Sequence, residues 1–132
     1  MDKWLFGAAA VFALLGLLAH EFLGAPRVLD PLTGAGLPPE VVWLHHFSWH
    51  VGTVATAAMV VMFFFASRRP DRLPPAILAT AMSLSFAGIG IGLAIGPGPE
   101  LWRTPAPYLW SLVSMLGGLG IWTSPGRRLR RR

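Results

Sequence analysis

VVWLHHFSWHVGTVATAAMVVMFFFA, residues 41–66, is an apolar run that contains no Lys, Arg, Asp or Glu. About 20 residues of helix are enough to cross the ~30 Å hydrocarbon core of a bilayer, so this run predicts a membrane-spanning helix. It also carries His45, His46 and His50, three of the four histidines of the chain. Ionisable side chains at membrane depth are costly, which makes these histidines candidates for a functional site.

Three further apolar runs lie at residues 4–23, 75–95 and 107–124. Hydrophobic residues make up 54% of the chain and charged residues 13%, and the mean hydropathy is +0.56, a balance too apolar for a soluble domain of this length. With no water in the bilayer core to satisfy backbone groups, each run is expected to cross as a helix. We therefore predict an all-α protein, one integral membrane domain over residues 1–132, folded as an antiparallel bundle of four transmembrane helices.

The basic residues predict the orientation of these helices. Nine of the eleven fall at one end of the predicted bundle: Lys3, Arg68, Arg69, Arg72, Arg127, Arg128, Arg130, Arg131 and Arg132. Arg27 and Arg103 fall at the other end. The positive-inside rule then predicts that both termini are cytoplasmic. The basic tail has no interleaved aromatic residues, so we expect it to contact the lipid bilayer and no nucleic acid.

The histidines are expected to lie at the outer side. At about 1.5 Å per residue, His20 lies about 4–5 Å inside the outer end of the first helix, and His50 about 13–14 Å inside the second if that helix begins at Val41. His46 and His50 are four residues apart and share a helix face, whereas His45 is rotated by about 100°. We expect His20, His46 and His50 to point inward together, with His45 at the interface and Glu21 nearby.

Imidazoles with a carboxylate, in a chain without cysteine, suit Cu, Zn or Fe, and two imidazoles on facing helices suit a haem b iron. The leading prediction is a metal or haem site of His20, His46 and His50, with His45 and Glu21 as further ligands, serving electron transfer or metal handling. The alternative is a structural or assembly subunit of a larger membrane complex, or a homo-oligomer, whose histidines are hydrogen-bonded and bind no metal. Ser83, Ser85, Ser111 and Ser114 lack a plausible His–Asp partner at their depth, so nucleophilic catalysis has little support. Whether the protein is an enzyme is left open by the sequence.

Small residues recur at helical spacing in three of the predicted helices. They are Ala9, Ala13 and Gly16 in the first, Ala81, Ser85, Gly88, Gly92 and Gly96 in the third, and Ser111, Ser114 and Gly118 in the fourth. Such spacing lets helix backbones approach closely in lipid, and we expect these residues to pack inside the bundle. The connection at residues 24–40 is expected to hold a short helical turn on the membrane surface.

One set of residues forms a short motif in the first half of the chain: His20, Gly24, Val28, Leu29, Pro31, Leu32, Trp49, His50 and Thr53. With these residues the chain resembles a group of small bacterial four-helix inner-membrane proteins that has no established activity. The resemblance implies a multi-pass location in the bacterial inner (cytoplasmic) membrane and the pairing of His20 with His50. His45 and His46 depart from the pattern of that group.

Overall fold

The computed structural model describes residues 2–69 and 73–124, and every regular element among them is helical. In chain order the elements are α1 (Asp2–Ala19), η1 (His20–Gly24), α2 (Ala25–Val28), η2 (Asp30–Gly34), α3 (Pro39–Arg68), α4 (Pro74–Ile95), η3 (Pro99–Arg103) and α5 (Ala106–Thr123). The all-α prediction is confirmed for the described residues. Residues 70–72 and 125–132 lie outside the described ranges, and they include six of the nine basic residues on which the predicted orientation rests.

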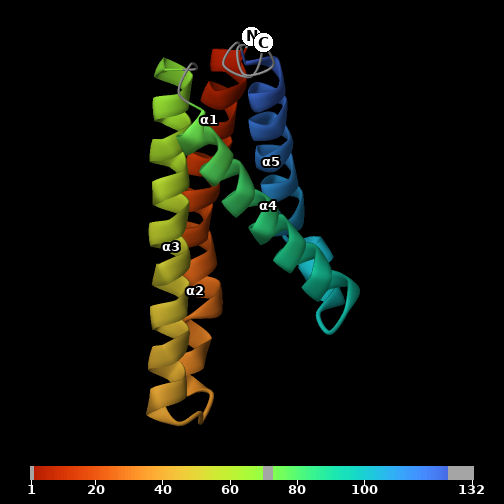
Figure 1. Cartoon of the computed structure of the whole chain (residues 1–132). Helices are drawn as coiled ribbons and strands as arrows, with labels where there is room; N and C mark the ends of the chain where they lie inside the picture. The colour runs from red at the N-terminus through yellow and green to blue at the C-terminus, as the bar shows by residue number, and fades with distance from the viewer. Residues whose placement is uncertain (1, 70–72, 125–132) are drawn as a thin grey trace.

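The first helix is longer than the sequence predicted. The elements α1, η1, α2 and η2 follow one another along a single line beside α3, so Asp2–Gly34 forms one continuous helical segment (Figure 1). The helical turn predicted in the connection at 24–40 is present as α2 and η2, but it continues the first helix past Pro26 instead of standing apart from it. Gly36, with a φ of +67°, then reverses the chain in a conformation that glycine adopts without strain, and Pro39 begins α3.

Two pairs of helices make up the molecule. The segment from α1 to η2 lies along the whole of α3, and α4 packs with α5, which also contacts α1 (Figure 1). At the end where α3 and α4 are joined, the helices lie close together. Toward the other end, α4 diverges from α3 (Figure 1). The described residues therefore form a bundle at one end only.

The buried core lies at the closed end of the molecule. Its large side chains are Phe6, Met59, Phe63 and Val113, each with no exposed surface, and they pack among alanines of α1, α3 and α4. Glycines of α5 make the closest approaches: a Cβ on Gly120 would lie 2.5 Å from Phe6 Cε1, and one on Gly117 would meet Phe63 and Thr80. Removing the side chain at these points lets the helices touch.

The small residues of α4 do not lie where the sequence predicted. Ala81, Ser85, Gly88, Gly92 and Gly96 are all exposed. The residues that α4 buries are instead Ala76, Ala79, Ser83, Ala87 and Ala94, on the opposite face. The prediction failed because both faces of α4 carry small residues at helical spacing, so the spacing could not identify which face packs inside the chain. In α1 the prediction is confirmed, since Ala9, Ala13 and Gly16 are buried.

Among the residues that the structure describes, three segments are long and apolar enough to cross a membrane: Asp2–Gly34, Pro39–Arg68 and Pro74–Ile95. The predicted spans 4–23, 41–66 and 75–95 fall inside them. The 18 residues of α5 would reach about 27 Å, slightly less than the hydrocarbon core. These lengths and compositions are those of a membrane protein.

Candidate outer-end polar site

The site begins with a widened turn of helix at His20–Gly24. Here the N–H of Ala25 bonds to the carbonyl of His20, five residues earlier, so η1 is a turn of π-helix. The next residue, Pro26, has no N–H and its ring would collide with the carbonyl of Phe22 in a regular α-helix. Widening the turn moves that carbonyl aside and lets the helix continue. Because successive residues of the wider turn are separated by a smaller angle, His20 and Glu21 both contact α3.

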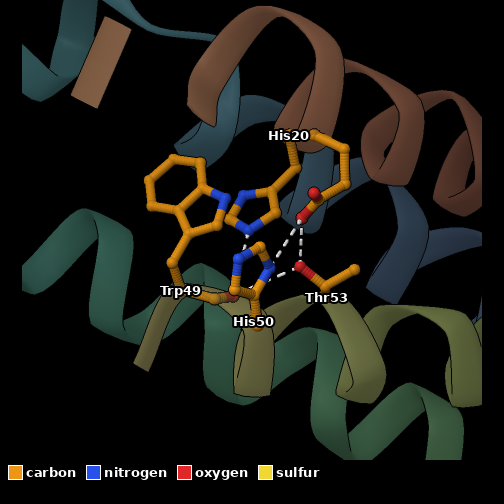
Figure 2. A network of polar contacts seen from close by, with 5 residues as sticks. His20, Trp49, His50 and Thr53 are labelled. Carbon is orange, nitrogen blue, oxygen red and sulfur yellow. Dashed lines mark hydrogen bonds and ion pairs between the residues drawn. The ribbon is translucent and has the colours of Figure 1, made fainter. Parts of the chain in front are cut away.

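His20 lies flat against Trp49 of α3. The two rings are parallel, with an interplanar angle of 7° and a centroid separation of 4.0 Å (Figure 2). Nε2 of His20 lies 3.3 Å from the carbonyl oxygen of Trp49. A carbonyl can only accept, so Nε2 carries the proton and donates it; in the neutral ring Nδ1 then keeps a free lone pair.

The fit between these two helices depends on glycine. A Cβ on Gly24 would lie 2.9 Å from Cζ2 of Trp49, and one on Gly52 would lie 3.8 Å from Nε2 of His20. The indole N–H of Trp49 is buried and has no hydrogen-bond partner within residues 2–69 and 73–124. Stacking and close packing therefore hold the indole in place.

Glu21 contacts two polar residues of α3, Thr53 and His50. Its Oε1 accepts a short hydrogen bond from the hydroxyl of Thr53 and lies 3.7 Å from Nδ1 of His50 (Figure 2). The Thr53 hydroxyl also lies 3.3 Å from the Trp49 carbonyl, but its single proton serves one acceptor at a time. The side chain of Glu21 is 27% exposed and that of His50 is 57% exposed. The carboxylate is thus held between the two helices, while the imidazole of His50 remains accessible.

His45 and His46 take no part in these contacts. Nδ1 of His45 donates to the carbonyl of Val41 on its own helix, 2.8 Å away, and His45 is exposed. The ring of His46 packs against that of Trp43, with centroids 5.2 Å apart. In the described part of the chain, no three His, Cys, Asp or Glu residues are grouped so that they could hold a metal ion. The structure brings together His20, Glu21 and His50 from the predicted set, and it separates His45 and His46 from them.

The level of the site along α3 follows from the helix itself. His50 comes 18 residues before Arg68 on one unbroken helix, which places the two about 27 Å apart. The 30 residues of α3 reach about 45 Å, about 15 Å more than a hydrocarbon core. The polar site therefore lies just beyond the buried residues of α3, on the side of the open end of the molecule.

Known proteins offer no comparison. No protein family model, curated protein or solved structure matches this chain. The resemblance described above therefore stays a prediction. The site must be interpreted from its geometry alone.

Sequence reasoning did not identify Trp49 as the partner of His20, although the structure stacks the two rings. Gly24 is the signal in the sequence, since a glycine on the facing helix makes space for an indole. Chemically the cluster offers a carboxylate, an accessible imidazole and a hydroxyl. These groups suit hydrogen bonding between helices, binding of a neutral polar group, or binding of a cation.

Proposed function

We propose that the protein crosses the bacterial inner membrane four times, with both termini in the cytoplasm. Lys3, Arg68 and Arg69 at the closed end support this orientation, together with the basic residues that follow α5 in the sequence, and α5 is the proposed fourth span. With Arg68 at the inner boundary, His50 lies just inside the outer boundary of a ~30 Å core. Alkaline phosphatase fused within residues 96–98 should be active, and the same enzyme fused after residue 132 should be inactive. The reverse pattern would refute the orientation.

We further propose that the protein is a structural or assembly subunit of a larger membrane complex. The supporting observation is the exposed face of α4 formed by Ala81, Ser85, Gly88, Gly92 and Gly96. A Cβ on Gly88 or Gly92 would meet no atom within 4 Å, so this face has no close neighbour in the described chain. Small residues with this spacing let a second helix approach closely in lipid. In this proposal the outer-end histidines connect α3 to the first helix and bind no metal.

A photo-crosslinking amino acid tests this proposal directly. Placed at Ile89 or Leu84, which are 61% and 62% exposed on α4, it should give a crosslinked product of one discrete mass. Placed at Val11 or Leu15, which are 56% and 53% exposed on α1, it should give only lipid adducts. The same pattern at both helices would contradict the proposal. Mass spectrometry of the product would tell a second copy of this chain from another subunit.

A metal or haem site serving electron transfer or metal handling is the second candidate. The distance of 3.7 Å between Nδ1 of His50 and Oε1 of Glu21 favours it. Two ligands of one tetrahedral ion, each at about 2.1 Å, lie about 3.4 Å apart, so a small movement would let both bind. An absorption spectrum without a Soret band, together with elemental analysis showing no stoichiometric Cu, Zn or Fe, would exclude this candidate.

A further inference from the structure

A shallow groove runs along α3 next to the polar site. It has a volume of about 430 Å³ and is lined by Phe47, His50, Val51, Val54, Ala55 and Ala58. All six of these residues lie on α3, so the groove is open on one side. From Phe47 to Ala58 the groove extends over 11 residues, or about 16 Å of helix. Apart from His50, every side chain that lines it is apolar.

His50 offers one nitrogen to this groove. Its Nδ1 lies toward Oε1 of Glu21, at 3.7 Å, and this places Nε2 on the other side of the ring. The structure, over its described ranges, gives Nε2 no hydrogen-bond partner. His50 lies near the end of the groove marked by Phe47, and about 12 Å of apolar helix continues from it to Ala58. An occupant therefore needs a polar head for His50 and an elongated apolar body.

The neighbouring carboxylate determines the charge of that head. A phosphate or other anionic head at His50 would lie close to Glu21 and be repelled, and it would have to leave water at the hydrocarbon boundary. A quaternary ammonium head has neither a lone pair nor a proton to offer Nε2. A neutral carbonyl or hydroxyl oxygen meets both conditions, because Nε2 can donate to the first or accept from the second.

We propose that this groove binds a neutral membrane-soluble amphiphile of the isoprenoid quinone class. The quinone oxygen bonds to Nε2 of His50, and the isoprenoid tail lies along Val51, Val54 and Ala58 toward the middle of the bilayer. Glu21, fixed by Thr53, is a positioning residue that orients the imidazole. This inference does not depend on the proposed subunit role, since the groove lies on α3 and the small-residue face lies on α4.

The test is a binding titration of the full chain in phosphatidylcholine nanodiscs that contain no quinone. The probes are decylubiquinone, a long-chain alcohol and an anionic phospholipid, and native mass spectrometry counts the bound molecules. We expect decylubiquinone to bind in a 1:1 ratio, with the alcohol competing more weakly and the anionic phospholipid not competing. Equal competition by the phospholipid would mean an ordinary lipid groove and overturn the proposal, as would the absence of quinone binding.

Paired variants localise the site. His50→Ala and Val54→Trp should each weaken quinone binding about tenfold or more, by removing the hydrogen bond and by filling the groove. His45→Ala and Val61→Trp are matched controls on exposed positions of α3 outside the groove and should leave affinity unchanged. Ala58→Leu provides a milder block if Val54→Trp does not fold. If a folded groove-blocking variant binds as tightly as the controls, the proposal is wrong.

Discussion

Adjacent glycines of α5 give a matched test of how the two helix pairs are held together. A Cβ at Gly117 would meet Oγ1 of Thr80 on α4, and Cε1 and Cζ of Phe63 on α3 at 3.0 and 3.1 Å. Neither neighbour has space to move: Phe63 is fully buried, and the Thr80 hydroxyl is bonded to the carbonyl of Ala76 at 2.7 Å. A Cβ at Gly118 would meet nothing within 4 Å.

The magnitude follows from comparing the two alanine variants. Both gain up to about 1 kcal/mol of helix propensity, and this gain cancels in the comparison. Overpacking in a filled core costs about 1–3 kcal/mol, and only Gly117→Ala incurs it. Gly117→Ala should therefore be less stable than Gly118→Ala by about 1–3 kcal/mol.

Unfolding by sodium dodecyl sulfate in mixed micelles, followed by circular dichroism, measures this difference. A Thr80→Ala background should recover part of the loss, because it removes one of the colliding atoms. If Gly117→Ala proves as stable as Gly118→Ala, the close contact among α3, α4 and α5 described above does not exist.

Three further predictions concern the polar site and are measured in the same unfolding assay. Gly24→Ala should destabilise by about 1–3 kcal/mol through collision with Trp49, and by clearly less in a Trp49→Leu background; an equal loss in both would refute the contact. In a double-mutant cycle, Glu21→Leu, which removes the acceptor, and Thr53→Val should couple by about 0.6 kcal/mol and by no more than about 1.7, as interhelical hydrogen bonds in membranes do, and a coupling of zero would contradict the bond. His20→Phe keeps a flat ring and should retain most of the stacking with Trp49, whereas His20→Ala should lose it, so near-ultraviolet circular dichroism should change much more for the alanine variant.

The helices themselves could be predicted because composition and length decide them. Residues 41–66 are apolar throughout, and a bilayer allows such a run only one conformation. The end of the first helix could not be predicted in the same way. Pro26 ordinarily ends a helix, and only the widened turn at His20–Gly24 shows how the chain continues past it.

The site could be predicted in part for a similar reason. The depth of each residue along its helix predicted that His20, Glu21 and His50 lie near one another. In the structure His20 stacks on Trp49, and Glu21 lies next to His50. Which way each side chain points was harder to predict. The prediction assumed the angles of a regular α-helix, and the π-helical turn η1 changes those angles. The facing of α4 could not be predicted for a different reason: small residues occupy both of its faces, and only tertiary contacts distinguish the buried face from the exposed one.

The position of the core has a consequence for how the molecule opens. Buried residues of α3 run from Thr56 to Ala66 and none lies before them, so the first half of this helix is held by the polar site and little else. Local opening needs less free energy where few apolar contacts must be broken. Backbone amides of residues 41–50 should thus exchange hydrogen for deuterium well before those of residues 56–66. The polar site lies between these two parts of α3, so loosening it would free residues 39–50 while residues 56–66 stay packed in the core.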